Sequence, residues 1–407
     1  MTTDRVVIIG ASHAGAQLCT SLRQEGWSGE IVLISDEPVL PYHRPPLSKT
    51  FLAGTAGLDD LLIRPPLYYE KQRITLRPGR VISIDRAEHR ICMHDGETLS
   101  YTKLALCLGA SPRALLISGA NMHGVHTLRS AADVLAIRAE VAAARRVVII
   151  GAGYIGLETA ASLRKLGLAV TVLETAERVL QRVTAPTVSA FYARVHSEEG
   201  VQLRTGVCIT ALIGDDRVRG VQLADGEVLA ADLVIVGIGV VPNVKLAEAA
   251  DLAVENGIVI DAHGRTSDPD IVAAGDCAAH PCPFTGQHLR LESVPNAGEH
   301  AKVAAATLCG KHKVISSLPW FWSDQYDLKL QIAGLNSGYD HVVLRGDPNV
   351  GRSFSCFYLR NGRLIAADCV NQPKDFLLSK QIISQGQSID INYLAHADFD
   401  KQPLPRN

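Results

Sequence analysis

Two glycine-rich segments repeat one design, and each is followed further along the chain by a carboxylate. The first runs from Gly10 to Gly15 (GASHAG) and is followed by Asp36; the second runs from Gly151 to Gly156 (GAGYIG) and is followed by Glu174. In a strand–turn–helix unit such glycines allow a sharp turn, close approach of a pyrophosphate and tight helix–strand packing. The helix N-terminus offers N–H groups to phosphate, and the carboxylate accepts hydrogen bonds from ribose hydroxyls. Two dinucleotide sites are therefore predicted, although Ser12 replaces the middle glycine of the first turn.

The second carboxylate also bears on the choice of coenzyme. Glu174 suits a free ribose 2′-hydroxyl and repels a 2′-phosphate, which favours NADH over NADPH. Arg178 and Arg182 lie near it in the sequence and could weaken that preference.

Both glycine turns need a strand before them and a helix after them. Short apolar runs flank each turn, and helical patterns follow the turns as far as Leu22 and Leu166, so two β–α–β units are predicted, with strands at Val6–Ile9, Ile31–Ile34, Val147–Ile150 and Val170–Leu173. Further strands are predicted around Val201–Leu203, Val218–Leu223 and Leu233–Val236, with a turn at Asp225-Gly226.

The later part of the chain contains two informative segments. Thr266–Cys277 is an apolar strand running into Gly275-Asp276, where the aspartate could bind a ribityl or phosphate-linked hydroxyl or simply form a turn and N-cap. From about Ser316 the composition changes, and the aromatic-rich Pro319–Tyr326 precedes alternating segments at Lys329–Ile332 and Ser353–Leu359. These predict a third, smaller domain with antiparallel strands.

Composition limits the class of protein. The chain has 407 residues, a formal net charge of -2 and 47% hydrophobic residues, which predicts two or three well-packed domains. The charge argues against a general nucleic-acid binder, and no apolar run reaches the length of a membrane span. Met1–Arg5 leads into Val6–Ile9 without the features of a signal peptide, so we expect a soluble cytoplasmic protein.

Nine cysteines without a signal peptide predict reduced thiols. Cys277 and Cys282 lie close together in the sequence. They could form a redox disulfide or be a chance pair in a loop, and their position in the chain favours the second interpretation. No cluster has zinc or iron–sulfur spacing, so no metal site is predicted.

Several longer motifs resemble one family over essentially the whole chain. They are GASHAG, PYHRPPLSK (Pro41–Lys49), GAGYIGLE (Gly151–Glu158), TAPTVSAFY (Thr184–Tyr192), TSDPDIVAAGDC, ESVPNA (Glu292–Ala297) and PWFWSDQYDLKLQ (Pro319–Gln331). The chain resembles the NADH-dependent ferredoxin reductases of bacterial oxygenase systems. The resemblance implies an α/β fold with two Rossmann-like domains, as in glutathione reductase, and a small α+β C-terminal domain. The implied division is an FAD domain at 1–110 and 240–318, an NAD domain at 111–239, and a C-terminal domain at 319–407 that covers the flavin.

The resemblance also assigns site residues by motif. Those implied to contact FAD are Gly10, Ala14, Gly15, Asp36, Arg44, Lys49, Val81, Arg129, Asp276, Val294 and Trp320. Those implied to contact NADH are Gly151, Gly153, Tyr154, Ile155, Gly156, Glu158, Glu174, Arg182, Gly237 and Ile238. Lys49 and Glu158 are implied to be catalytic, with Lys49 near flavin N5 and paired with Glu158. Trp320 and Trp322 could equally be core aromatics of the C-terminal domain.

Family members usually read Ala-Thr-Gly where this chain has Leu106–Gly109, which we expect to alter packing more than chemistry.

The implied reaction takes hydride from NADH to FAD and passes single electrons to a [2Fe–2S] ferredoxin. That ferredoxin would feed a Rieske dioxygenase or a cytochrome P450, and the reductase would be a monomer or weak dimer. An acidic ferredoxin requires a basic rim, for which Arg64 and Lys302 are candidates.

Three alternatives remain, of which the first two share this fold. A disulfide reductase carries a thiol pair after the second strand of its FAD unit, where this chain has Pro41–Lys49 without cysteine. An NADH oxidase often needs a redox cysteine at that same position. A flavin-bearing signalling protein resembling apoptosis-inducing factor would show a targeting sequence, an insertion or a basic surface. Rapid NADH-dependent reduction of a [2Fe–2S] protein distinguishes electron transfer from all three.

Overall fold

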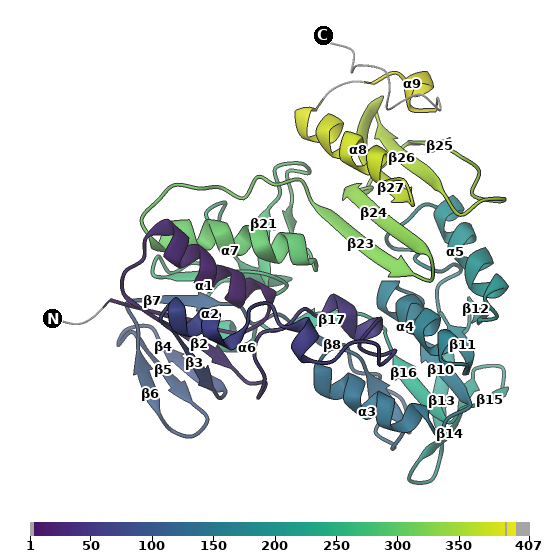
Figure 1. The fold of residues 1–407 in the computed structure, drawn as a ribbon, viewed down its shortest axis with the longest axis horizontal. Coiled ribbons are helices and arrows are strands. Elements are labelled where there is room, and N and C mark those ends of the chain that lie inside the picture. Colours follow the sequence, from purple (N-terminus) through teal and green to yellow (C-terminus); the bar gives the residue numbers. More distant parts are fainter. Residues whose placement is uncertain (1–3, 387–388, 396–407) are drawn as a thin grey trace. The chain divides into compact units, whose positions relative to one another are not determined.

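The computed structural model describes residues 4–386 and 389–395, which fall into two compact units (Figure 1). Unit 1 comprises residues 1–43, 58–111 and 240–317, and unit 2 comprises residues 44–57, 112–239 and 318–407.

Unit 1 is built on a five-stranded parallel sheet. Its strand order is β20-β7-β1-β2-β3, with bounds β1 (Arg5–Ile9), β2 (Glu30–Ser35), β3 (Ile74–Pro78), β7 (Lys103–Leu106) and β20 (Ile271–Ala273). Side chains of β1 alternate between two buried clusters, with Val7 and Ile9 in one and Val6 and Ile8 in the other. Residues of α1 (His13–Glu25) and α7 (Val294–Leu308) pack on the face of Val6 and Ile8. Because both faces are buried, the strands are continuous apolar runs rather than alternating ones.

Smaller elements complete unit 1. They are an antiparallel sheet of β4 (Val81–Asp85), β5 (Arg90–Met93) and β6 (Thr98–Ser100), a sheet of β18 (Val254–Glu255), β19 (Gly257–Val259), β21 (Ala278–Pro281) and β22 (His288–Leu289), the helices α2 (Pro66–Lys71) and α6 (Lys245–Glu248), and the 3-10 turn η2 (Asp59–Leu61). At the points where the chain leaves and re-enters this unit, β8 (Ala110–Pro112) pairs with β17 (Val240–Pro242).

Unit 2 contains a second five-stranded parallel sheet. Its order is β12-β11-β10-β16-β9, with bounds β9 (Val125–Thr127), β10 (Arg146–Ile150), β11 (Ala169–Leu173), β12 (Gln202–Arg204) and β16 (Leu233–Val236). An antiparallel sheet of β13 (Ile209–Gly214), β14 (Val218–Leu223) and β15 (Val228–Ala230) shares an apolar cluster with it. The helical elements of this part are η1 (Pro45–Ser48), α3 (Ala131–Val141), α4 (Tyr154–Lys165) and α5 (Pro186–Glu198).

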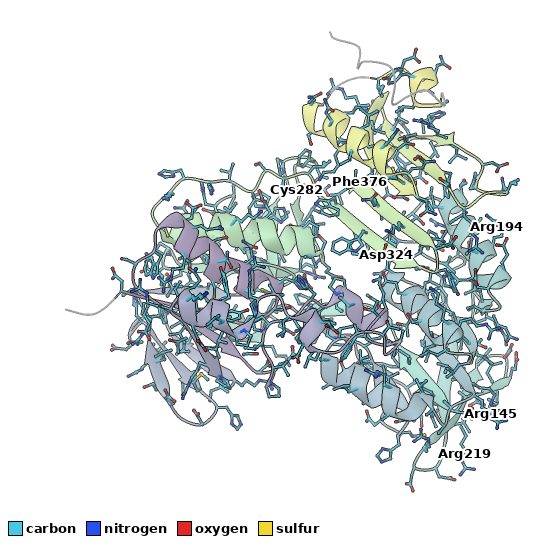
Figure 2. All side chains as sticks on the ribbon, viewed as in Figure 1. Arg145, Arg194, Arg219, Cys282, Asp324 and Phe376 are labelled. Carbon is cyan, nitrogen blue, oxygen red and sulfur yellow. The ribbon has the colours of Figure 1, made fainter. Side chains whose placement is uncertain are left out.

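An antiparallel sheet also belongs to unit 2 and is formed by the last part of the chain (yellow and light green in Figure 1). Its order is β23-β24-β27-β26-β25, with bounds β23 (Trp320–Gln325), β24 (Leu328–Gly334), β25 (His341–Arg345), β26 (Phe354–Arg360) and β27 (Arg363–Val370), followed by α8 (Pro373–Gln385) and α9 (Ile391–Ala395). Arg194 on α5, labelled in Figure 2, donates to the carbonyls of Pro348 (3.0 Å) and Gly351 (2.7 Å). The C-terminal sheet is therefore hydrogen-bonded to the nucleotide-type part of the same unit.

The predicted strands and the predicted turn are confirmed to within a residue or two, including β14 at Val218–Leu223 and β16 at Leu233–Val236. One segment is grouped differently: residues 44–57 lie in unit 2, where Ser162 on α4 donates to the carbonyl of Ser48 (2.6 Å), whereas the sequence places them in the first flavin stretch. The three-domain division itself stays a prediction. Among the described residues, no helix has the length and apolar character needed to span a membrane.

A buried carboxyl in the C-terminal sheet yields a prediction about stability and pH. Asp368 on β27 is fully buried and accepts a hydrogen bond from the Tyr358 hydroxyl. Burial raises the pKa of Asp368 from 3.8 to about 7. The folded state thus holds a proton that the unfolded state has released between these pH values, so stability falls as pH rises through this window.

We expect Asp368→Asn to remove that dependence. At pH 8 the variant should gain stability relative to wild type, by on the order of 1.4 kcal/mol for each unit of pKa shift that is relieved. Thermal unfolding measured from pH 5 to pH 8 checks this. Parallel pH profiles of the two proteins would contradict it.

Candidate active site

The second glycine turn joins β10 to α4 and has two sterically required glycines. Gly151 has φ +106°, and a Cβ there would lie 2.4 Å from the carbonyl oxygen of Gly237. At Gly156 a Cβ would lie 2.1 Å from the carbonyl oxygen of Gly151. At Gly153, by contrast, a Cβ would meet nothing within 4 Å. Gly153 is the N-cap of α4, so open space lies in front of a helix N-terminus, as an approaching diphosphate requires.

The Glu174 carboxylate is fixed beside this turn. Its Oε2 accepts from the Ala152 amide (2.7 Å), and its Oε1 accepts from the Ala176 amide (2.9 Å). Arg182 approaches the segment that contains Gly237 and Ile238, since a Cβ on the next residue, Gly239, would lie 3.7 Å from its guanidinium. The structure therefore brings together residues predicted from three separate segments for the nicotinamide nucleotide.

Lys49 and Glu158 form an ion pair. Lys49 follows η1, and its Nζ lies 2.7 Å from Oε2 of Glu158 on α4 and 3.1 Å from the carbonyl oxygen of Pro45. The Glu158 side chain is 2% exposed and that of Lys49 is 19% exposed, so the lysine is the more exposed member of the pair. Burying a carboxylate is costly unless charge and hydrogen bonds compensate it, and here both do.

Two serines that the sequence analysis missed complete the surroundings of Glu158. Ser48 Oγ donates to Oε2 (2.5 Å), and Ser323 Oγ donates to Oε1 (2.7 Å). Ser48 directly precedes Lys49, and Ser323 directly follows Trp322, so both lie inside motifs that were noted for other residues. Of the other predicted residues, Tyr154 packs its ring against Phe321 (4.8 Å between centroids), and Ile155 is exposed.

In unit 1 some of the residues predicted for FAD lie at or beside the first glycine turn. A Cβ at Gly10 would lie 2.1 Å from the carbonyl oxygen of Cys107, and one at Gly15 would lie 2.0 Å from that of Gly10. A Cβ at Gly275 would lie 3.1 Å from Cβ of Ala14, so the Gly275-Asp276 segment adjoins the start of α1.

The remaining members of this set in unit 1 occupy strand and helix ends. Asp36 follows the last residue of β2 and is exposed, Val294 begins α7, and Val81 begins β4. Backbone close to backbone at Gly10 and Gly15, at the start of α1, suits a second pyrophosphate, so the turn fits the group that the sequence implies. Within the departing segment Leu106–Gly109, the carbonyl oxygen of Cys107 lies against Gly10 and the thiol is buried.

The other residues predicted for FAD lie in unit 2. Arg44 Nη1 donates to the carbonyl of Arg129 (2.7 Å), just before the N-terminus of α3. Trp320 stacks in an aromatic cluster, with ring centroids 5.5 Å from Trp322 and 5.7 Å from Phe376, and Lys380 Nζ lies 5.0 Å from its ring (Phe376 is labelled in Figure 2). The alternative that Trp320 packs within the C-terminal domain is thus supported, and a flavin contact stays a prediction.

Cys277 and Cys282 are both buried free thiols. Cys277 Sγ lies 3.5 Å from the carbonyl oxygens of both Leu106 and Ala274, either of which can accept its proton, and burial raises the pKa of this thiol to about 11. A thiol with that pKa is a poor nucleophile, which supports the structural interpretation of the pair. Within residues 4–386 and 389–395, no group of three or more His, Cys, Asp or Glu side chains is arranged to hold a metal ion.

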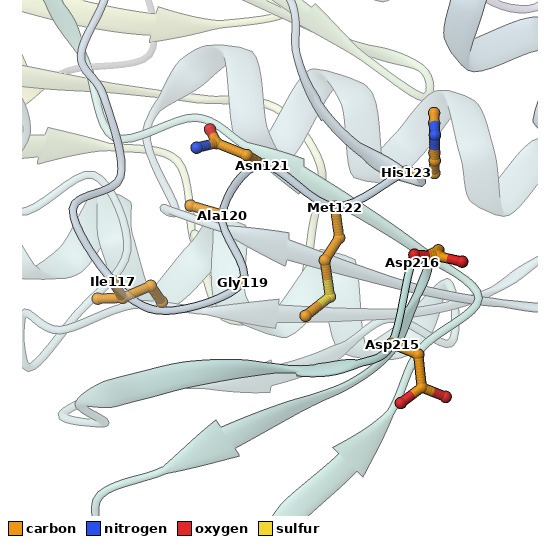
Figure 3. Close-up of a pocket in the computed structure, with 8 residues that line it drawn as sticks. All are labelled: Ile117, Gly119, Ala120, Asn121, Met122, His123, Asp215 and Asp216. Atoms are coloured by element: carbon orange, nitrogen blue, oxygen red, sulfur yellow. The ribbon is translucent and has the colours of Figure 1, made fainter.

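A separate hollow of about 580 Å³ in unit 2 contains none of the predicted site residues. Figure 3 shows its rim, formed by Ile117, by residues 119–123, and by Asp215 and Asp216 of the β13–β14 hairpin. It is open and mostly polar, so it does not resemble the concave apolar sites that bind cofactors.

Comparison with known proteins agrees with this geometry. Residues 4–301 match the family described as pyridine nucleotide-disulphide oxidoreductase, and residues 320–404 match the reductase C-terminal family. The chain is similar to putidaredoxin reductase of Pseudomonas putida, with 46% identity over 96% of this chain and 94% of that protein. It is 42% identical to the ferredoxin–NAD(+) reductase component of an anthranilate 1,2-dioxygenase system of Burkholderia cepacia, over 97% and 98% of the two chains. A solved covalent complex of putidaredoxin reductase with putidaredoxin contains a chain of 44% identity, with a TM-score of 0.94 over 97% of this chain and 96% of that one.

Two parallel nucleotide-type sheets and an antiparallel C-terminal sheet define a pyridine nucleotide-disulphide oxidoreductase. Within that class the chain belongs to the ferredoxin reductases of bacterial oxygenase systems, and its activity is that of a ferredoxin–NAD(P)+ reductase. The predicted family and fold class are confirmed.

Proposed function

We propose that the chain takes hydride from NADH onto FAD and passes single electrons to an acidic [2Fe–2S] ferredoxin that feeds a Rieske dioxygenase or a cytochrome P450. The observation that carries the proposal is the Lys49–Glu158 ion pair, in which a buried carboxylate holds the ammonium of a partly exposed lysine. Such a cation favours negative charge developing on a bound electron acceptor. FAD, when bound, supplies the change from two-electron to one-electron transfer.

The glycine turns and the residues gathered around them would hold the two nucleotides. The residues that would bind FAD are Gly10–Gly15, Asp36, Asp276, Arg44, Lys49, Arg129 and Trp320. Gly151–Gly156, Glu174, Arg182, Gly237 and Ile238 would bind NADH. Metal chemistry is not required of any residue in either set.

Anaerobic stopped-flow spectroscopy tests the proposal. The purified yellow protein is mixed with NADH, and then with a [2Fe–2S] ferredoxin. Fast bleaching followed by one-electron reoxidation through the ferredoxin is expected. Bleaching with reoxidation only by disulfides or oxygen would instead support a disulfide reductase or an oxidase.

Glu174 should set the coenzyme preference. We expect Glu174→Ser to lower the ratio of kcat/KM for NADH over NADPH about tenfold, because hydrogen bonds to a charged acceptor are worth roughly 1.5–3 kcal/mol. Glu177→Ser is the matched control, since Glu177 is an exposed carboxylate three residues away that touches no part of the glycine turn in the hydrogen bonds described. Equal ratios in wild type and Glu174→Ser would reject this role of Glu174.

The ferredoxin contact is tested by charge. Arg64 is half-buried with its guanidinium 5.4 Å from the Tyr68 ring, and Lys302 is exposed on α7. Reversing both charges (Arg64→Glu, Lys302→Glu) should raise the KM for ferredoxin several-fold, about tenfold at low salt, and leave NADH-dependent dye reduction intact. Unchanged ferredoxin kinetics at low salt would exclude these residues from the docking surface.

A further inference from the structure

A chain of hydrogen bonds runs from a surface turn to Glu158 within unit 2. Ser323 Oγ lies 2.7 Å from Glu158 Oε1, and Gln325 Nε2 lies 3.1 Å from Ser323 Oγ. Gln325 Oε1 lies 2.8 Å from His196 Nε2, and His196 Nδ1 lies 3.2 Å from the hydroxyl of Tyr326. This chain of hydrogen bonds joins α4, β23, α5 and the turn that follows β23.

Every hydrogen bond in this chain has one possible direction when Glu158 is ionised. A carboxylate only accepts, so the Ser323 hydroxyl donates to it and must accept from the Gln325 amide nitrogen. The Gln325 oxygen then faces His196, which therefore carries its proton on Nε2. The neutral ring leaves Nδ1 as an acceptor for the Tyr326 hydroxyl. All four donors thus point toward Glu158.

Three members of this hydrogen-bond chain are shielded from water. Ser323 and His196 are fully buried, and Gln325 is 2% exposed. Burial lowers the pKa of His196 to about 4, so the ring is neutral at neutral pH. In such surroundings a donor without its acceptor costs more than it would at the surface, so the arrangement resists rotation of any one member.

The two carboxylate oxygens of Glu158 have different partners. Oε2 faces Lys49 and Ser48, whereas Oε1 is held by the chain through Ser323. Rotation of the carboxylate would break the bond to Ser323 and move the negative charge relative to Lys49. The position of the ammonium therefore depends on residues that touch neither Lys49 nor the glycine turn.

We propose that Ser323, Gln325 and His196 are positioning residues that fix the orientation and the negative charge of Glu158 beside Lys49. The proposal rests on the proposed role of the Lys49–Glu158 pair in NADH-dependent reduction. It assigns this role to the serine and glutamine of the PWFWSDQY motif rather than to its tryptophans.

The first test is the tautomer of His196 in the FAD-loaded protein. Long-range ¹H–¹⁵N correlation spectra of the imidazoles, with His196→Gln used only to assign the signals, should show Nε2 protonated and Nδ1 as an acceptor at neutral pH. The opposite tautomer would overturn the proposal, because Gln325 would then have to present its nitrogen to His196 and could not donate to Ser323.

The second test uses two buried serines of the same sheet as a matched pair. Ser355 Oγ donates to Asp375 Oδ2 (2.6 Å) much as Ser323 does to Glu158, and both serines are fully buried. Ser323→Ala and Ser355→Ala should lower the melting temperature alike, but only Ser323→Ala should slow flavin reduction by NADH, about tenfold. Gln325→Leu should act in the same direction, and Ser323→Thr should restore the rate because it retains the hydroxyl.

The outcomes separate this proposal from the function on which it rests. If Ser323→Ala and Gln325→Leu reduce flavin at the rate of Ser355→Ala while Glu158→Gln is slow, the positioning role is wrong and the role of Glu158 stands. If Glu158→Gln itself reduces flavin at the wild-type rate, the proposed role of the ion pair fails.

Discussion

Replacing Lys49 by methionine is expected to slow NADH-dependent flavin reduction about 100-fold, since removing one preorganised electrostatic contact in an active site commonly costs that much. The variant keeps a linear apolar side chain in place of the lysine stem and removes only the ammonium. Glu158 would then be a buried carboxylate with hydrogen-bond donors but without a compensating charge. The rate is measured by anaerobic stopped flow at saturating NADH.

Stability provides a second, independent readout of the same pair. Removing one partner of a buried ion pair lowers the free energy of unfolding by about 3 kcal/mol, because the other charge stays buried without compensation. Lys49→Met should therefore unfold more easily than wild type. The double variant Lys49→Met/Glu158→Gln should recover part of that stability, because it also removes the uncompensated charge. Recovery of stability without recovery of the reduction rate would separate the structural role of the pair from its role in electron transfer.

The control is an ion pair near the surface. Lys103 pairs with Asp270 in unit 1, with both side chains about one-third exposed. Lys103→Met should change stability by less than about 1 kcal/mol and leave the reduction rate unchanged. A Lys49→Met protein that reduces flavin as fast as Lys103→Met would remove the ion pair from the proposed function.

Placing a single methyl group at Gly153 is expected to weaken NADH binding by up to about 100-fold without destabilising the fold. Gly153 has φ -78° and no atom within 4 Å of a Cβ placed there, so alanine fits the structure. The methyl group would occupy the space through which the pyrophosphate reaches the helix N-terminus, and overpacking of this kind costs roughly 1–3 kcal/mol. Titration with NAD+ and the melting temperature are the two measurements.

Two further alanine variants provide comparisons for this result. Gly156→Ala should lower the melting temperature as well as NADH binding, because its Cβ would lie 2.1 Å from the carbonyl oxygen of Gly151. Gly298→Ala on α7 meets nothing within 4 Å and should leave NADH binding unchanged while adding about 0.5–1 kcal/mol of stability. Tight NADH binding by Gly153→Ala would show that the open space at the turn is not the route of the diphosphate.

The elements that carry the glycine turns could be predicted from the sequence because their signals are local. β1 and β10 are runs of Val and Ile, each followed at once by a glycine and then by a helical pattern. Strand propensity, a turn that requires glycine and helix periodicity all act within a few residues. The family motifs extended this to Lys49 and Glu158, whose ion pair the structure contains.

What local signals could not show was the set of residues around that pair. Ser323 lies 165 positions from Glu158, and His196 lies 129 positions from Gln325. A buried serine or glutamine has no local pattern that distinguishes it from any other polar residue near a strand end. The grouping of residues 44–57 with unit 2 was likewise set by contacts such as that between Ser48 and Ser162.

The sequence by itself determined where the two turns bend, which carboxylates follow them and which family the chain resembles, because glycine conformation and hydrophobic periodicity are properties of neighbouring residues. Only the tertiary structure decided that Glu158 is buried, that two serines donate to it and that a neutral histidine lies behind them. Burial and hydrogen-bond direction depend on which distant elements pack together, and packing is a property of the whole fold.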